Sequence, residues 1–120
     1  MLKNALLVAV GGALGSTGRY LVAQVLRNYH FPWATFLVNI AGCFIIGAVL
    51  AFSLRNSGFE QNWRVFLASG ICGGFTTYSA FSLEMLSMLQ QNRLILFAVY
   101  LLATVVIGLI ATWLGYTLFK

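Results

Sequence analysis

The stretch "GICGGFTTYSAFSLE", residues 70–84, decides the fold because it interrupts a segment that otherwise reads as an apolar helix. It carries three glycines, four serine or threonine residues besides Tyr78, and Glu84. Adjacent glycines weaken a helix, and hydroxyl groups can bond to the carbonyls that a break would free. The stretch therefore raises the question of what these polar groups serve inside an apolar segment.

The composition of the whole chain is that of a membrane protein. Of its 120 residues, 61% are hydrophobic and 8% are charged, and the mean hydropathy is +0.92. Four continuous apolar stretches reach the roughly 20 residues that a helix needs to cross hydrocarbon. They cover residues 4–26, 33–54, 64–89 and 94–119. They lack the period-two alternation of a barrel strand, so we predict an all-α membrane protein with four transmembrane helices in a single domain, residues 1–120.

The third helix should be broken near Gly73–Thr77. A continuous helix from Arg64 to Leu89 would measure about 39 Å, which exceeds the roughly 30 Å of hydrocarbon. A break would leave carbonyls and helix ends bare near the middle of the membrane, which is tolerable only where they face protein, an ion or water. The alternative is a kinked helix whose threonines bond back to the preceding turn.

Basic residues are shared almost evenly between the two sides of the predicted membrane span. The N-terminal side has Lys3, Arg55, Arg64 and Lys120, and the other side has Arg27, Arg93 and, if it reaches that side, Arg19. Orientation follows the Lys/Arg bias of short loops. So slight a bias predicts insertion both ways up and an antiparallel, dual-topology homodimer. The alternative is that other factors fix one orientation.

Several classes of function are disfavoured by the residues present. The chain has no Asp, only Glu60 and Glu84, and one histidine, His30, so neither a carboxylate pair nor a Ser-His-Asp set can form within one chain. The net charge of +5 comes from residues scattered over loops and termini, which suits lipid headgroups rather than nucleic acid. Cys43 and Cys72 lie within spans and lack CxxC spacing, so we expect packing rather than a disulfide or metal role.

The first span combines small residues with a cation. Gly11 and Gly15, like Gly12 and Ser16, are four residues apart and should form a smooth ridge for close helix packing. Arg19 follows on the same helix. A cation inside a span costs several kcal/mol unless it reaches water or a partner. Arg19 should therefore either snorkel to the membrane surface or line an aqueous vestibule.

Polar stripes follow the helical repeat in three spans. Tyr78 and Phe81, three apart, share a face near Ser79, Ser82 and Glu84; Thr35 and Asn39 are four apart, as are Tyr100 and Thr104. Polar residues in a span tend to face a pathway. The stripes therefore indicate either a narrow hydrophilic track or helix–helix hydrogen bonds worth about 0.6 kcal/mol each.

Three segments in this order, "GGALGSTGRY" (11–20), "WATFLVNIAG" (33–42) and "GICGGFTTYSAFSLE", resemble the signature segments of the Fluc (CrcB) fluoride channels, and the resemblance covers the whole chain. It implies a dual-topology homodimer in the bacterial cytoplasmic membrane, with two antiparallel fluoride pores. It also implies a structural sodium ion at the dimer centre, bound by backbone carbonyls of Gly73 and Thr76. The implied pore residues are Asn39, Tyr78, Phe81, Tyr100 and Thr104, with Thr35, Ser79 and Glu84 nearby and Arg19 as the vestibule candidate.

The implied chemistry is physically reasonable, although two positions depart from the family pattern. A bare anion in a low-dielectric interior costs tens of kcal/mol unless donors replace its water, and aromatic ring edges are positive. Tyr78 stands where most members have phenylalanine, and at Gly108 the polar track lacks a hydroxyl that some relatives have. Two rivals remain: a small multidrug exporter, which needs a carboxylate in the first span where this chain has Arg19, and a noncatalytic membrane assembly subunit.

Overall fold

The computed structural model describes residues 1–27, 31–55 and 61–120. His30 and Glu60 lie outside these residues. The helices are α1 (Leu2–Val25), α2 (Trp33–Arg55), α3 (Gln61–Arg64), the π-helical segment η1 (Val65–Cys72), α4 (Gly73–Phe75), α5 (Tyr78–Gln90) and α6 (Leu94–Phe119). The described ranges contain helices and no strand, which confirms the predicted all-α class.

Three of these helices, α1, α2 and α6, are long and apolar enough to cross a membrane. They contain 24, 23 and 26 residues. Many of their large apolar side chains are exposed on the outside of the bundle. A helix that is apolar on its outer face suits lipid rather than water, so the chain is a multi-pass membrane protein.

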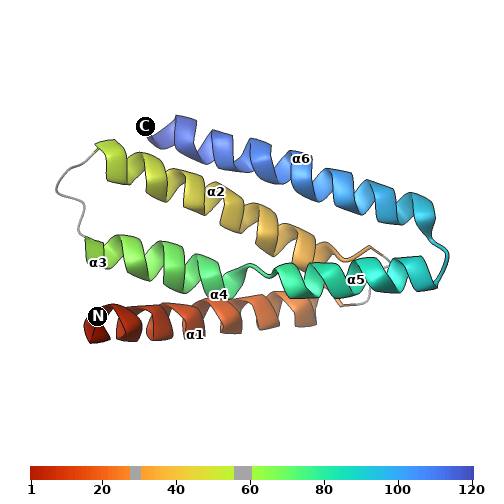
Figure 1. The fold of residues 1–120 in the computed structure, drawn as a ribbon, viewed down its shortest axis with the longest axis horizontal. Helices are drawn as coiled ribbons and strands as arrows, with labels where there is room; N and C mark the ends of the chain where they lie inside the picture. Colours follow the sequence, from red (N-terminus) through yellow and green to blue (C-terminus); the bar gives the residue numbers. More distant parts are fainter. Residues whose placement is uncertain (28–30, 56–60) are drawn as a thin grey trace.

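The segment from Gln61 to Gln90 is interrupted within the predicted range. Thr76 (φ −89°, ψ 156°) and Thr77 (φ −152°, ψ 122°) are extended between the end of α4 and the start of α5. Figure 1 shows the chain passing from α4 to α5 as a short non-helical link. The backbone therefore breaks, rather than only bending as in the kinked alternative. The π-helical turns of η1 directly before it are a feature often found near functional sites.

The helices form two closely packed layers, with α1 against η1 and α4, and α2 against α6 (Figure 1). Glycines allow this close approach. A Cβ atom on Gly15 would collide with the Ile71 carbonyl, and one on Gly74 would lie 2.5 Å from the Gly12 carbonyl oxygen. The predicted small-residue ridge of α1 is therefore confirmed as the surface that packs on the broken helix.

The aromatic core lies beside the break rather than at the centre of the long helices. Phe36, Phe81, Met85, Met88 and Tyr100 form the buried cluster that joins α2, α5 and α6. Because this cluster begins one turn into α5, it fixes the position of the second half of the broken helix relative to α2 and α6.

Candidate functional site

Asn39 of α2 stabilises the extended backbone between α4 and α5. Its Nδ2 donates to the Thr77 carbonyl over 3.1 Å, and its Oδ1 accepts from the Thr77 amide over 2.8 Å. In a continuous helix that amide would bond to the Gly73 carbonyl. A single side chain thus satisfies both backbone groups of an extended residue, as a non-helical segment at membrane depth requires.

The neighbouring hydroxyls complete the two helix ends. Thr76 Oγ1 donates to the Cys72 carbonyl over 2.7 Å, which closes the end of the first half-helix. Thr77 Oγ1 accepts from the Ala80 amide over 3.2 Å and so caps the start of α5. Ser79 Oγ lies 3.1 Å from Thr77 Oγ1 and is exposed. The candidate Ser79 is therefore linked to the cap of α5.

Arg19 is anchored to the same break from the opposite side. Its Nε donates to the Gly74 carbonyl over 3.3 Å, and Ser16 Oγ donates to the same oxygen over 3.4 Å. Positive charge near the carbonyl end of a half-helix is favourable. The guanidinium is thus held at the end of α4 rather than extended freely toward a headgroup layer.

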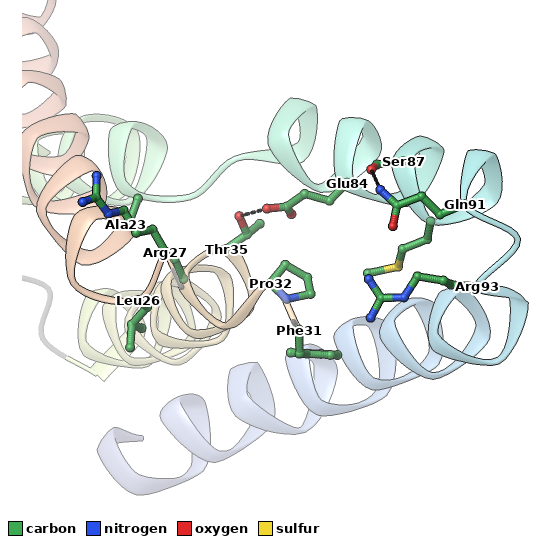
Figure 2. Close-up of a pocket in the computed structure, with 12 residues that line it drawn as sticks. Ala23, Leu26, Arg27, Phe31, Pro32, Thr35, Glu84, Ser87, Gln91 and Arg93 are labelled. Carbon is green, nitrogen blue, oxygen red and sulfur yellow. Dashed lines mark hydrogen bonds between the residues drawn. The ribbon is translucent and has the colours of Figure 1, made fainter. Parts of the chain in front are cut away.

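Glu84 joins three helices through two hydrogen bonds. Thr35 Oγ1 donates to Glu84 Oε2 over 2.8 Å, and the Tyr100 hydroxyl donates to Glu84 Oε1 over 2.8 Å. Figure 2 shows Glu84 reaching from α5 toward Thr35 on α2. Thr35 and Tyr100 are both buried. The structure therefore brings together three of the predicted site residues, of which Thr35 and Glu84 lie 49 positions apart and Glu84 and Tyr100 lie 16 apart.

Removing the Tyr100 hydroxyl should destabilise this cluster. The substitution Tyr100→Phe leaves Glu84 Oε1 without its donor in a buried setting, where such a loss costs about 1–3 kcal/mol. Thermal unfolding of the purified protein should show a lower midpoint for Tyr100→Phe. The matched control is Tyr116→Phe, because the Tyr116 hydroxyl makes no hydrogen bond among the described residues. Equal midpoints for the two variants would contradict the assigned role of the Tyr100–Glu84 bond.

The predicted aromatic pair is adjacent but unequally buried. The ring centroids of Tyr78 and Phe81 lie 6.1 Å apart. Phe81 is 8% exposed and meets Tyr100 edge to face, with centroids 4.9 Å apart and ring planes at 69°. Tyr78 is 80% exposed. Phe81 is thus held rigidly by the core, whereas in a single chain the Tyr78 ring projects from the surface beside it.

Thr104 completes the set from α6. An open cavity of about 480 Å³ has Asn39, Thr77, Tyr78, Phe81 and Thr104 in its lining. Thr104 Oγ1 is buried and makes no hydrogen bond within the described residues. A buried hydroxyl of this kind in a native protein calls for an explanation such as water or a ligand. A polar ligand or an ion in this cavity would therefore find a hydrogen-bonding partner in the Thr104 hydroxyl.

A second pocket, of about 360 Å³, opens at the other side of the Glu84 cluster. Figure 2 shows its lining, in which Thr35 and Glu84 lie between Arg27 on one side and Gln91 and Arg93 on the other. Its cations are Arg27 and Arg93. The lining also contains the carboxyl group of Glu84, with which neither arginine makes an ion pair within the described ranges, so two cations against one acidic group leave this mouth with a net positive charge.

On each of three helices, a residue of the Glu84 cluster lies one helical turn from a residue that lines the larger cavity. Thr35 and Asn39 lie four positions apart on α2, Glu84 and Phe81 three apart on α5, and Tyr100 and Thr104 four apart on α6. The first member of each pair belongs to the Glu84 cluster, and the second lines the larger cavity. One turn advances about 5.4 Å. A continuous row of polar and aromatic side chains therefore runs from the charged mouth to the break.

The backbone carbonyls of Gly73 and Thr76 fit a cation site. Neither accepts a hydrogen bond from any residue the structure describes, because the Thr77 amide bonds to Asn39 instead of Gly73, and the Ala80 amide bonds to the Thr77 hydroxyl instead of Thr76. Both lie at the carbonyl end of a half-helix, where the dipole is negative. Unwound carbonyls and half-helix ends of this kind coordinate Na⁺ in membrane proteins. The donor set is thus suited to a hard cation.

Sequence reasoning identified these residues but missed how they are connected. Nothing in the local sequence shows that Asn39 would hydrogen-bond to the backbone of Thr77, or that Arg19 would hydrogen-bond to the carbonyl of Gly74. These bonds span 38 and 55 positions. The sequence signal for these contacts was compositional. The first and second apolar spans each contain a polar side chain, Arg19 and Asn39, and the third contains adjacent glycines and threonines.

Comparison with known proteins gives a consistent result. The family described as "CrcB-like protein, Camphor Resistance (CrcB)" matches residues 6–116. The "Fluoride-specific ion channel FluC" of Flavobacterium psychrophilum is 40% identical, with 99% of this chain and 98% of that protein covered. "Fluoride-specific ion channel FluC 2" of Rhodococcus jostii is 48% identical over 94% and 96%, and the FluC protein of Leptospira interrogans serovar copenhageni is 44% identical over 98% and 95%. The resemblance of the three motifs is thereby confirmed, and the chain belongs to the CrcB-like family.

Proposed function

We propose that this protein is a fluoride-selective ion channel that lets fluoride leave the cell passively, through two antiparallel pores in a dual-topology homodimer. The relatives that match nearly the full chain are named fluoride-specific ion channels. The protein is accordingly a channel and not an enzyme. The observation that carries the proposal is the polar row between the two pockets, which ends at the unpartnered hydroxyl of Thr104.

The row can replace the water that fluoride sheds. A bare anion in a low-dielectric interior costs tens of kcal/mol unless donors surround it. Thr104 has a free hydroxyl, and Asn39 has a second amide hydrogen beyond the one given to Thr77. Ring edges carry partial positive charge, and the Phe81 ring is fixed by its contact with Tyr100. These are several modest sites rather than one deep well, as conduction requires.

The two ends of the pathway suit an anion. Arg27 and Arg93 at the charged mouth raise the local anion concentration. Arg19, held at Gly74, adds positive charge next to the break. A negative-inside potential favours anion exit by about 2.3 kcal/mol per charge per 100 mV. Glu84 lowers this positive field at the centre of the row, where Thr35 and Tyr100 each donate a hydrogen bond to one of its carboxylate oxygens.

A second, inverted copy would complete the pore. We infer that the interrupted segment from Gln61 to Gln90 is a fourth span, since Figure 1 shows both termini at the same end of the single bundle. Tyr78 is 80% exposed beside the open cavity, so its ring can be buried only by another molecule, such as a second copy of the chain.

Labelling of a single introduced cysteine in the loop between α1 and α2 from either side of intact vesicles tests the inversion. We expect both sides to label; labelling from one side only would contradict it.

We propose that sodium is a structural ion of this dimer, held by the Gly73 and Thr76 carbonyls. When bound, it would supply positive charge at the carbonyl end of the half-helix. This chain's own part is to keep those carbonyls free, through the Asn39 bond to the Thr77 amide. Exchange of all external sodium for a large organic cation should leave fluoride efflux unchanged at first and lower it only over hours. An immediate loss of efflux would mean that sodium is not structural.

Replacing Phe81 by isoleucine should abolish fluoride conduction without unfolding the protein. The variant keeps apolar bulk but loses the aromatic ring in the cavity lining. We expect fluoride efflux to fall at least about 100-fold, which corresponds to about 2.7 kcal/mol of barrier. Phe119→Ile, in a ring outside the row, is the matched control and should conduct normally. Normal efflux through the Phe81 variant would remove the ring from the mechanism.

Liposomes that contain only the purified chain separate this proposal from its rivals. Voltage-driven fluoride efflux without chloride efflux supports the channel. Proton-coupled cation exchange would indicate a small multidrug exporter, which Arg19 in the first span already disfavours. No flux of either kind would indicate an assembly subunit and would contradict the proposed function.

A further inference from the structure

Two cysteines line the larger cavity although the sequence gives no reason to pair them. Cys43 comes from α2 and Cys72 from the end of η1, and both border the cavity of about 480 Å³ together with Asn39 and Thr104. Both are free thiols; Cys43 is half-buried and Cys72 is buried. The fold thus brings both cysteines, which the sequence suggested as packing residues, into the lining of one cavity.

The backbone around each thiol holds it in place. A Cβ atom on Gly108 would lie 3.4 Å from Cys43 Sγ, so the glycine of α6 leaves room for this thiol one turn beyond Thr104. The Cys72 carbonyl accepts from both the amide and the hydroxyl of Thr76, which fixes its position at the break. Both thiols therefore occupy fixed positions in the lining of the same cavity.

The two thiols are the soft ligands in the lining of this cavity. Its other polar groups are neutral amides, hydroxyls and carbonyls, without a carboxylate or an imidazole. Described residues form no group of three or more histidine, cysteine or acidic side chains. Thiolates prefer Cu⁺-like soft cations, whereas Mg²⁺ and Ca²⁺ need charged oxygen ligands. Two sulfurs suit a soft cation of low coordination number.

We propose that Cys43 and Cys72 form a two-sulfur binding site for a soft monovalent metal cation, Cu⁺ or Ag⁺, and that its occupancy blocks conduction. Each thiol gives its proton to water as its sulfur–metal bond forms, and the metal keeps its oxidation state. Two thiolates and one monovalent cation carry a net charge of −1. The bound metal would thus both narrow the cavity and repel an anion. The blocking step, unlike the binding step, rests on the proposed channel function.

Silver ion in chloride-free nitrate buffer is the probe, and the first readout does not depend on transport. Titration of the purified full-length protein should show thiolate–metal ultraviolet absorption that saturates at one Ag⁺ per chain. Cys43→Ser and Cys72→Ser should each weaken this binding at least tenfold. Cys43→Ala and Cys72→Ala serve as second variants if a serine variant is not monodisperse. Undiminished binding in the double variant Cys43→Ser/Cys72→Ser would overturn the site.

The second readout places the site in the conduction path. In liposomes, stoichiometric Ag⁺ should stop fluoride efflux of the wild type and leave efflux of Cys43→Ser unchanged, and a thiol chelator should restore the wild-type rate. Bound Ag⁺ with normal wild-type efflux would overturn the block. A wild type that conducts no fluoride but still binds Ag⁺ through both cysteines would refute the channel proposal while supporting the metal site, so the two failures are distinguishable.

Discussion

Asn39→Leu is expected to abolish fluoride efflux and to lower stability by about 2–6 kcal/mol. The leucine leaves both the amide and the carbonyl of Thr77 without the partners that Asn39 provides over 2.8 and 3.1 Å. Each buried backbone group left unpaired costs about 1–3 kcal/mol. The extended link should then collapse toward a continuous helix, because only a helix satisfies these groups internally. Fluoride-electrode traces from liposomes and thermal unfolding in detergent measure the two effects.

Ser53→Ala is the matched control for Asn39→Leu. Ser53 lies on the same helix, but its hydroxyl donates to the Val49 carbonyl four residues earlier, within α2 itself. Such a local bond contributes little to a helix, so efflux and unfolding should stay close to those of the wild type. If the Asn39→Leu protein conducts as well as Ser53→Ala, then conduction does not depend on the two hydrogen bonds between Asn39 and Thr77.

A pair of glycine substitutions on α1 should act in opposite directions. The Cβ atom of Gly15→Ala would meet the Ile71 carbonyl and lie 2.8 Å from the Phe75 amide nitrogen. These are backbone atoms of the broken helix, which cannot move aside like a side chain, so the loss should reach or exceed the 1–3 kcal/mol typical of overpacking. The Cβ atom of Gly12→Ala would come no closer than 4.0 Å to the Gly70 carbonyl. Alanine there should add up to about 1 kcal/mol of helix propensity.

Unfolding midpoints of the two alanine variants test this packing directly. Gly15→Ala should be strongly destabilised, or fail to yield monodisperse protein, whereas Gly12→Ala should match or exceed the wild type. Equal unfolding midpoints for the two variants would contradict the conclusion that direct backbone contact between α1 and the broken helix stabilises the break.

The helices and the location of the break follow from local sequence, because hydrophobic length and paired glycines act over one or two turns. The extended conformation of Thr76 and Thr77 does not, since it depends on an amide contributed by Asn39 from another helix. Sequence alone could not separate a break from a kink for this reason. Arg19 illustrates the same limit: its position in the first span was evident, but its bond to the Gly74 carbonyl depends on how α1 packs against α4.

Helical spacing predicted which residues share a face but not what covers that face. Tyr78 and Phe81 share one face as expected, yet Phe81 is 8% exposed and Tyr78 is 80% exposed. The difference arises because α6 brings Tyr100 against Phe81 alone. In the same way, no spacing rule could place Cys43 and Cys72 in the lining of one cavity, because that arrangement depends on how α2 packs against η1.

The reversal potential of a planar bilayer with fluoride on one side and chloride on the other tests the central claim most directly. A row of small donors and ring edges that replaces the hydration shell of a compact anion should select fluoride so strongly that the potential lies near the fluoride equilibrium value. A reversal potential near zero, or the absence of any current from active, correctly folded protein, would contradict the account.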